Sequence, residues 1–237
     1  MIKNSETELT STPPLRGGRE GLIISPSLLA ADFGNLQAAC EMINESEAEW
    51  LHIDVMDGVF VPNISFGFPV MKAIKKHCKK VLDVHLMIVH PEKYIQRFRD
   101  AGADIITFHY ETAENPCEII ELIRKSGAKV GITINPDVPV AALEPFVNNV
   151  DLVLIMSVFA GYGGQNFIEE THSRLAELNE IKRRKNANFL IEVDGGVNLK
   201  NAPKIFASGA DILVAGSAVF NAKNPMEAIK GLKSEYE

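Results

Sequence analysis

The sequence predicts an α/β protein that folds as one (β/α)8 TIM barrel. Three observations support this prediction: eight short apolar runs recur after residue 21, helical patterns lie between them, and polar residues gather near the carboxyl ends of the runs. The runs are almost continuously apolar and rich in β-branched residues, which is typical of parallel strands covered on both faces. Eight strands alternating with eight helices over about 215 residues indicate a barrel, and a doubly wound open sheet is the alternative.

The predicted strands follow one another at short intervals along the chain. They are LIISPSLL (22–29), WLHIDVM (50–56), VLDVHLM (81–87), DIITFHY (104–110), KVGITIN (129–135), DLVLIMS (151–157), NFLIEVD (188–194) and DILVAGS (211–217). Helical spacing of apolar residues, opening prolines and closing glycines predict helices between many of them. These helices are expected at 33–46, 91–102, 116–127, 171–185, 199–210 and 224–237.

The composition is that of a globular protein, with 46% hydrophobic and 23% charged residues. A length of 237 residues does not require a second domain. The net charge of −7 argues against nucleic acid or an anionic membrane as the main partner, and no apolar run is long enough to span a bilayer. The three cysteines are far apart, which predicts free thiols and a cytoplasmic location.

The chain is expected to divide into a short extension and one catalytic domain. Residues 1–21 are polar and rich in Ser, Thr, Pro and Gly, which is typical of a flexible extension. They lack the apolar core of a secretory signal peptide. The barrel is therefore expected to occupy residues 22–237.

Four titratable residues are expected at one mouth of the barrel. His52 and Asp54 lie in the second predicted strand, His85 lies near the end of the third, and Asp194 closes the seventh. Residues i and i+2 of a strand share a face, so His52 and Asp54 point the same way. Taken singly, each is more simply a hydrogen-bonded core histidine or a capping aspartate. Buried together, however, they predict a site for one divalent metal ion, either Zn²⁺, Fe²⁺, Mn²⁺ or Co²⁺.

Two neighbouring aspartates are not expected to react. Asp57 begins an Asp-Gly turn and is interpreted as a turn former. Asp83 precedes His85 by two residues and is expected to orient its neighbours.

Glycine-rich segments follow the last three predicted strands, at FAGYGGQNF (159–167), GGV (195–197) and AGSAVF (215–220). Backbone N–H groups in such loops approach an anion closely, and barrels often hold a phosphate near the ends of strands 7 and 8. The glycines therefore predict a phosphorylated substrate. Gly163 and Gly164 are also candidate hinges of a lid. Neither GxxxxGK[ST] nor a strand-linked GxGxxG occurs, so a nucleotide is not the first expectation.

The two carboxylates predict acid–base chemistry on a small sugar phosphate. Asp54 and Asp194 come from strands that are well apart around the barrel, so they are expected to face each other across the substrate. One would remove a proton from a carbon beside a ketone, and the other would return a proton to the opposite face. The metal would stabilise the enediolate charge. Three methionines at strand ends either fill the core or line the wall around this intermediate: Met56, Met87 and Met156.

Several longer segments resemble one known family. SPSLLAADF, LHIDVMDGVFVPNISFG, DVHLMI, GYGGQ, IEVDGGVN and AGSAVF occur in the order found in ribulose-phosphate 3-epimerases, and the resemblance covers about residues 22–228. It implies a metal-dependent isomerase of carbohydrate metabolism, in the pentose phosphate pathway, that interconverts D-ribulose 5-phosphate and D-xylulose 5-phosphate. It also implies a homo-oligomer.

The resemblance carries over to individual positions. It implies that His52, Asp54, His85 and Asp194 bind the metal, and that the two aspartates are the acid–base pair. The implied substrate contacts are Ser27, Met56, His85, Met87, Met156, Gly161, Tyr162, Gly163, Gly164, Gly195, Gly196, Gly216 and Ser217. The chain departs from the family at Phe159-Ala160, where similar enzymes carry Asn-Pro or Glu-Pro. Losing the proline is expected to loosen the start of the loop.

Other functions remain open from the sequence. One is a 3-epimerase of another ketose phosphate such as D-allulose 6-phosphate, although ISFGFPV (64–70) and DGGVN (194–198) look more like the pentose enzymes. Another is a non-catalytic sugar-phosphate binding protein, against which the intact His and Asp set argues. A decarboxylase of the orotidine type is expected to carry DxKxxD, whereas the segment here reads DVMDGV.

Overall fold

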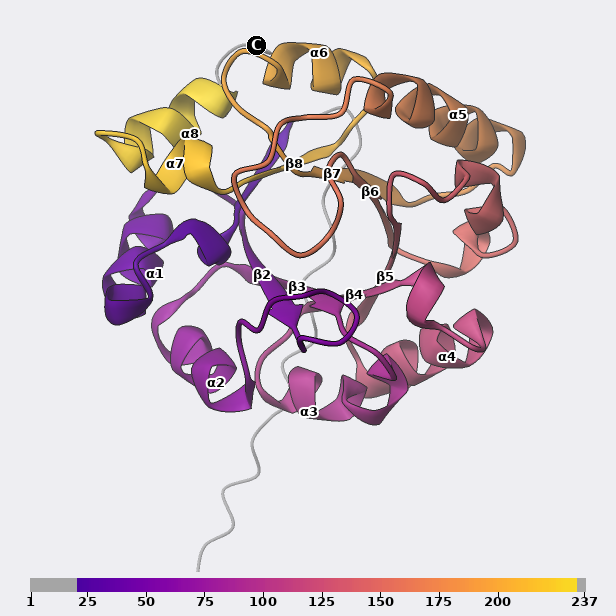
Figure 1. Cartoon of the computed structure of the whole chain (residues 1–237), viewed down its shortest axis with the longest axis horizontal. Coiled ribbons are helices and arrows are strands. Elements are labelled where there is room, and N and C mark those ends of the chain that lie inside the picture. The colour runs from indigo at the N-terminus through magenta and orange to yellow at the C-terminus, as the bar shows by residue number, and fades with distance from the viewer. Residues whose placement is uncertain (1–20, 234–237) are drawn as a thin grey trace, which may run out of the picture.

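The computed structural model describes residues 21–233, and the predicted extension therefore lies almost wholly outside the described residues. Within them, eight parallel strands form the wall of a barrel with helices around it (Figure 1). The strands are β1 (Ile23–Pro26), β2 (Trp50–Met56), β3 (Val81–Met87), β4 (Ile105–His109), β5 (Lys129–Ile134), β6 (Leu152–Met156), β7 (Leu190–Asp194) and β8 (Ile212–Ala215). All eight predicted strands are confirmed.

The sheet runs in the order β1-β8-β7-β6-β5-β4-β3-β2, so β2 to β8 each pair with their sequence neighbours and β1 pairs with β8. A parallel bridge between Ser27 and His52 joins the two end strands and closes the barrel. This topology confirms the single-domain TIM barrel and rules out the doubly wound open sheet.

The helices follow the predicted order with two differences. The α-helices are α1 (Leu36–Glu45), α2 (Phe68–His77), α3 (Ile95–Asp100), α4 (Pro116–Ser126), α5 (Thr171–Arg184), α6 (Ala202–Ala207), α7 (Ser217–Phe220) and α8 (Pro225–Lys233). Short 3₁₀ helices lie at η1 (Leu28–Ala30), η2 (Phe33–Asn35), η3 (Pro91–Lys93), η4 (Tyr110–Thr112), η5 (Val140–Leu143) and η6 (Val147–Asn149).

The prediction of one α-helix after each strand is wrong for the connection between β5 and β6. Only η5 and η6 lie there. Three prolines, Pro136, Pro139 and Pro145, interrupt this segment and prevent a continuous helix. After β8, by contrast, the chain forms both α7 and α8.

Strand β2 shows how the core is divided between the two faces of the wall. Leu51, Ile53 and Val55 belong to the large cluster between the strands and the helices. Trp50 belongs to a second cluster, which fills the inside of the barrel with Leu152, Leu154 and Ile212. Burying a large apolar side chain contributes about 1.5–3 kcal/mol. Because both faces are covered in this way, the alternation that is usual in half-exposed strands is absent from the sequence.

No helix within residues 21–233 is long and apolar enough to cross a membrane. The three cysteines are free, as predicted, with Cys40 and Cys78 buried and Cys117 exposed.

Candidate active site

The register of β2 against β3 places the polar residues in pairs. His52 lies opposite Asp83, and Asp54 lies opposite His85. Because alternate residues of a strand share a face, these four side chains point together into the barrel. All four are buried. Strand β7 adds Asp194 at its carboxyl end.

Four ligand atoms meet at this point. His52 Nε2 and His85 Nδ1 each lie 3.2 Å from Asp54 Oδ1. They lie 3.9 and 3.8 Å, respectively, from Asp194 Oδ2. A tetrahedral site with metal–ligand distances near 2.1 Å separates its donors by roughly 3.4 Å. The structure thus brings together the four residues that the sequence singled out, in an arrangement that could hold a metal ion.

Hydrogen bonds from outside the cluster fix the orientation of its members. His52 Nδ1 contacts Asp83 Oδ2 at 2.6 Å, so Asp83 orients the imidazole as expected. Ser27 Oγ donates to Asp54 Oδ2 at 2.7 Å. This leaves Asp54 Oδ1 for the two histidines.

The charges in the cluster are strongly coupled. Burial opposes a charged His52, but the Asp54 and Asp83 carboxylates raise its pKa well above the usual value. Burial likewise opposes a charged Asp54, but His52 and His85 hold its pKa well below its usual range. At Asp194, burial and the charge of Asp54 raise the pKa to about 7. The two carboxylates therefore differ in basicity, which suits an acid–base pair.

Metal binding is expected to release protons from the metal-free protein. Below pH 7, His52 and Asp194 are both protonated because their pKa values are raised, and each must lose its proton to become a ligand. We expect about two protons per Zn²⁺ at pH 6, with the share from Asp194 disappearing as the pH rises through about 7. Calorimetry in buffers of different ionisation enthalpy measures this number. A release that is the same at pH 6 and pH 8 would contradict the raised pKa of Asp194.

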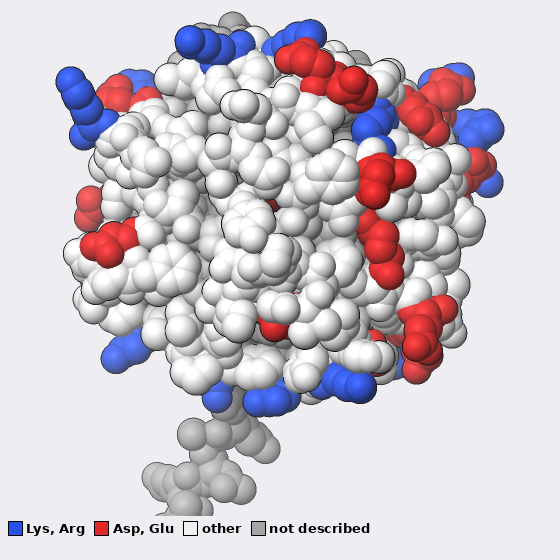
Figure 2. All heavy atoms as spheres, in the orientation of Figure 1, with Lys and Arg blue, Asp and Glu red and all other residues white. Residues whose placement is uncertain are grey.

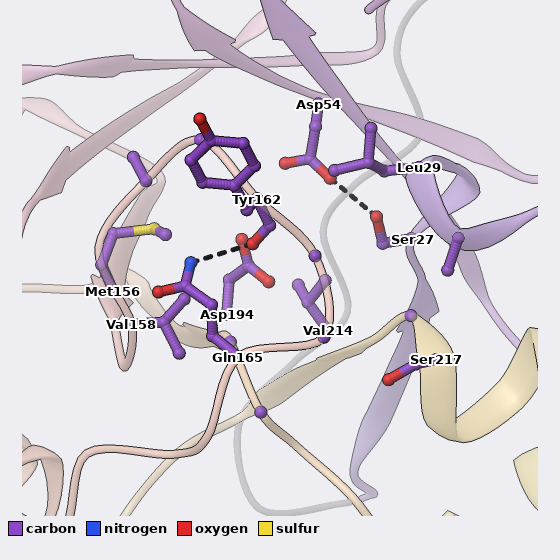
Figure 3. A pocket seen from close by; sticks show the side chains of 18 of the residues that line it. Ser27, Leu29, Asp54, Met156, Val158, Tyr162, Gln165, Asp194, Val214 and Ser217 are labelled. Atoms are coloured by element: carbon purple, nitrogen blue, oxygen red, sulfur yellow. Dashed lines mark hydrogen bonds between the residues drawn. The ribbon is translucent and has the colours of Figure 1, made fainter. Parts of the chain in front are cut away.

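The pocket above the cluster has an apolar wall. Met56, Met87 and Met156 all line it, and all three are buried. Met56 lies opposite Met87 in the β2–β3 register, and Met156 lies opposite Asp194 across β6 and β7. Figure 3 shows Met156 and Asp194 beside each other, with Asp54 entering from another side of the pocket.

The rim of the pocket consists of the predicted glycine-rich segments. Gly161, Tyr162, Gly163, Gly164, Gly195, Gly196, Gly216 and Ser217 all line it. No lysine or arginine is among the described lining residues, and on the face in Figure 2 the basic side chains lie around the edge. An anion at this rim would therefore contact backbone N–H groups and the Ser217 hydroxyl.

The loop between β6 and α5 crosses the mouth of the barrel (Figure 1). The N–H of Ala160, which a proline would lack, donates to Asn135 Oδ1 at 3.0 Å. Gly161 O accepts from Asn63 Nδ2 at 3.2 Å, and Gln165 Nε2 donates to Tyr162 O at 2.9 Å. The start of the loop is thus anchored at the position where the loss of proline was expected to loosen it.

Gly196→Ala is expected to destabilise the protein. Gly196 has φ of +66°, and a Cβ atom there would lie 2.5 Å from the backbone nitrogen of Phe167. Holding a side chain in that conformation costs about 1–3 kcal/mol. Gly163→Ala is the matched control, because its Cβ would meet nothing nearer than Leu29 Cδ2 at 4.0 Å. Thermal unfolding should show a lower Tm for the first variant only, and equal Tm values would refute this account of the rim.

The structure also brings in residues that the sequence reasoning missed. His109, at the end of β4, is fully buried, and its Nε2 lies 2.9 Å from His85 Nε2. Glu192 is fully buried, and its Oε1 lies 3.7 Å from His52 Nδ1. Burial and Asp83 raise the pKa of Glu192 well above its usual value. Its i, i+2 spacing from Asp194 was a usable signal, as was the position of His109 at a strand end.

Asp57 is the turn former that the sequence predicted. Its Oδ1 accepts from the N–H groups of Val59 and Phe60, and its Oδ2 accepts from the N–H of Val89. Both carboxylate oxygens are therefore engaged in holding loops together.

Together the fold and this site define a (β/α)8 barrel enzyme whose reactive groups lie at the carboxyl ends of the strands. A model of the Ribulose-phosphate 3 epimerase family matches residues 23–220. The chain belongs to the ribulose-phosphate 3-epimerase family, whose members are carbohydrate isomerases, and the predictions of family and enzyme class are confirmed.

Individual relatives cover most of the chain. It is 44% identical over 221 residues to a ribulose-phosphate 3-epimerase of Synechocystis sp., which covers 91% of this chain and 94% of the relative. It is 45% identical over 221 residues to the chloroplastic ribulose-5-phosphate-3-epimerase of Arabidopsis thaliana, with coverage of 92% and 79%. The Bacillus subtilis ribulose-phosphate 3-epimerase is 42% identical over 214 residues, with coverage of 89% and 97%.

Solved structures at lower identity show the fold alone. A 3-hexulose-6-phosphate synthase aligns with a TM-score of 0.64 and 19% identity, over 90% of this chain and 97% of that one. A tryptophan synthase α-subunit from Pyrococcus furiosus aligns with a TM-score of 0.66 and 15% identity, over 90% and 95%.

Proposed function

We propose that this protein interconverts D-ribulose 5-phosphate and D-xylulose 5-phosphate by moving the proton at C3. The observation that carries the proposal is the convergence of Asp54 and Asp194 from strands β2 and β7 on one pocket. Membership of the ribulose-phosphate 3-epimerase family supports the same reaction. Each aspartate is within reach of a substrate held in that pocket, from a different side (Figure 3).

The four residues of the cluster fit a divalent cation. Their ligand atoms lie within 4.8 Å of one another, and they combine two imidazoles with two carboxylates. His52, Asp54, His85 and Asp194 would hold the ion. When bound, a divalent cation supplies a Lewis acid that draws electron density from the substrate carbonyl and lowers the barrier to removing the neighbouring proton.

Asp54 and Asp194 are the proposed acid–base pair. One carboxylate removes the C3 proton from one face of the substrate, and the other donates a proton to the opposite face, which inverts the carbon. The hydrogen bond from Ser27 holds the Asp54 carboxylate in place. In the reverse direction the two residues exchange roles.

The pocket around these groups positions the substrate and limits water. The glycine-rich rim offers backbone N–H groups and Ser217 to the phosphate. The three methionines present an apolar surface next to the reacting carbon, where water would otherwise solvate the developing charge. The loop across the mouth would open to admit the substrate and close over it.

An assay on two substrates tests the proposal. Metal-loaded protein is given D-ribulose 5-phosphate or D-allulose 6-phosphate, and the 3-epimer of each is measured. We expect a higher kcat/KM for the pentose phosphate. A large preference for the hexose phosphate would instead identify an epimerase of that substrate. Tight binding of both without turnover would indicate a non-catalytic sugar-phosphate binding protein.

The cellular setting follows from the same proposal. We expect a homo-oligomer in the cytoplasm, acting in the pentose phosphate pathway, and neither nucleic acid nor a membrane as a partner. Light scattering coupled to gel filtration measures the oligomeric state. A mass equal to the 26.0 kDa chain would overturn the oligomer prediction.

A further inference from the structure

A line of polar side chains leads from His85 toward the surface. His85 Nε2, on the opposite side of the ring from the ligand atom Nδ1, lies 2.9 Å from His109 Nε2. His109 Nδ1 in turn lies 3.4 Å from Glu111 Oε2. The proposed acid–base and metal-binding roles use neither His109 nor Glu111.

The two imidazoles meet through their nitrogens. Their ring centroids are 5.0 Å apart and their planes are inclined by only 22°, while the Nε2 atoms are 2.9 Å apart. The rings therefore meet edge to edge. An imidazole is ordinarily neutral at pH 7, and two nitrogens 2.9 Å apart can share only one proton. A neutral imidazole has one donor and one acceptor nitrogen, so one Nε2 donates and the other accepts.

Glu111 decides the direction of this hydrogen bond. Its Oε1 accepts from the N–H of Asn135 at 2.7 Å, and its side chain is 21% exposed. Burial opposes its charge, but His109 and the Asn135 N–H lower the pKa of the carboxyl. An ionised carboxylate only accepts hydrogen bonds. His109 Nδ1 is fully buried and makes no aligned hydrogen bond among the described residues, and Glu111 Oε2 is its ionic neighbour at 3.4 Å. We therefore place the proton of this ring on Nδ1, where it faces the carboxylate.

The remaining proton positions follow in order. With its proton on Nδ1, His109 accepts at Nε2, and His85 must donate from its own Nε2. His85 Nδ1 is then unprotonated, and it lies 3.2 Å from Asp54 Oδ1 and 3.8 Å from Asp194 Oδ2. Its lone pair thus faces the centre of the four-residue cluster.

We propose that His109 and Glu111 are positioning residues that fix the tautomer of His85, so that Nδ1 is presented to a divalent cation. The inference rests on the proposed metal site and deepens it. A histidine that binds a metal through one ring nitrogen generally donates a hydrogen bond from the N–H of the other nitrogen to a neighbouring group. Losing that neighbouring group typically costs about 10–100-fold in metal affinity. Here the neighbouring group is a second histidine, His109, and the Glu111 carboxylate sets the direction of the hydrogen bond between the two rings.

Glu111→Gln tests the proposal with almost no change in shape. The amide oxygen can still accept from the Asn135 N–H, which turns the amide N–H₂ toward His109 Nδ1. His109 is then expected to accept at Nδ1 and donate from Nε2, which forces the His85 proton onto Nδ1, the metal-binding atom. We expect Zn²⁺ affinity to fall by about 10–100-fold, as measured by competition with a chromophoric chelator on metal-free protein.

Nitrogen NMR of the metal-free protein supplies a signature that a purely structural role would not change. In the wild type, His109 should be protonated at Nδ1 and His85 at Nε2. In Glu111→Gln, the His109 proton should move to Nε2. Unchanged tautomers together with unchanged Zn²⁺ affinity would overturn the proposal. Neither readout involves a substrate, so a missing epimerase activity would be a separate failure.

Glu49→Gln is the matched control. Glu49 Oε2 also accepts from a backbone N–H, that of Ile24, at 3.1 Å, and Glu49 likewise contacts a second, side-chain donor, the ammonium group of Lys233. It precedes β2, at the other end of the barrel from the cluster. The Zn²⁺ affinity of the Glu49→Gln protein should equal that of the wild type. A comparable loss in this control would mean that the effect of Glu111→Gln is general destabilisation.

A second pair of variants covers the case in which Glu111→Gln does not fold. His109→Leu removes the acceptor for His85 Nε2–H. His109→Gln can keep both interactions in the same direction, because its amide oxygen accepts from His85 and its N–H₂ group faces Glu111. Zn²⁺ affinity should therefore fall about 10–100-fold in His109→Leu and less in His109→Gln. Equal affinities in the two variants would contradict the proposal.

Discussion

Asp194→Asn is expected to abolish epimerisation while the barrel remains folded. The amide cannot transfer the C3 proton, and loss of a general acid or base costs about 10²–10⁴-fold in rate. The variant also removes one of the two carboxylates of the proposed metal site. Epimerisation is measured at saturating metal, together with metal content, so that the loss of proton transfer is separated from the loss of metal. Turnover near that of the wild type would refute the two-carboxylate mechanism.

Although Asp194→Asn should lose activity, its metal-free form is not expected to lose stability. Burial and Asp54 raise the pKa of Asp194 from its usual value to about 7, so the folded protein binds this proton more tightly than the unfolded chain. The group therefore lowers the stability of the metal-free protein as the pH rises from about 4 to 7. Asp194→Asn removes that cost. We expect metal-free Asp194→Asn to be at least as stable as the wild type at pH 8, as measured by urea unfolding.

Asp54→Asn is expected to abolish epimerisation and, in contrast, to destabilise the fold. Asp54 accepts from Ser27 through Oδ2 and contacts both His52 and His85 through Oδ1. An amide offers only one accepting oxygen, and it leaves His52 with Asp83 as its nearest carboxylate. Breaking a buried ion pair costs about 3–5 kcal/mol in stability. Because His52 keeps its contact with Asp83, we expect the free energy of unfolding of Asp54→Asn to fall by an amount near the lower of these values.

Comparison of the two aspartate variants is therefore informative. Urea unfolding of the metal-free proteins should give a smaller free energy of unfolding for Asp54→Asn than for Asp194→Asn, although both lack activity. The reverse order would contradict the charge distribution described for the cluster. Ser27→Ala is a useful companion, because it removes only the hydrogen bond to Asp54 Oδ2 and should lower the rate less than either.

The strands could be predicted because the parallel barrel imposes one environment on all of them. Both faces are covered, so every strand is a short apolar run, and a polar residue inside such a run stands out. The i, i+2 spacing of His52 and Asp54 then predicted that both side chains point to the same face of the strand, and this required no knowledge of the neighbouring strands. The β5–β6 connection was less predictable, since counting one helix per strand overlooked three prolines in that segment.

The contacts around the cluster depend on register and could not be predicted from spacing. That His52 lies opposite Asp83, and Asp54 opposite His85, is a property of how β2 pairs with β3. His109 belongs to β4, and its contact with His85 depends on side-chain direction across the β3–β4 pair. The hydrogen bond from Ala160 to Asn135 joins two loops that are 25 residues apart, and no local pattern marks it.

Proton exchange with solvent reports directly on the two-carboxylate mechanism. Metal-loaded protein is incubated with D-ribulose 5-phosphate in D₂O, and the C3 position of the D-xylulose 5-phosphate formed is followed by ¹H NMR from the earliest turnovers. With two carboxylates on opposite faces, the proton that is delivered comes from the second residue and hence from solvent. We expect product that carries deuterium at C3 from the first turnover. Product that retains the original C3 hydrogen, or no product at all, would contradict it.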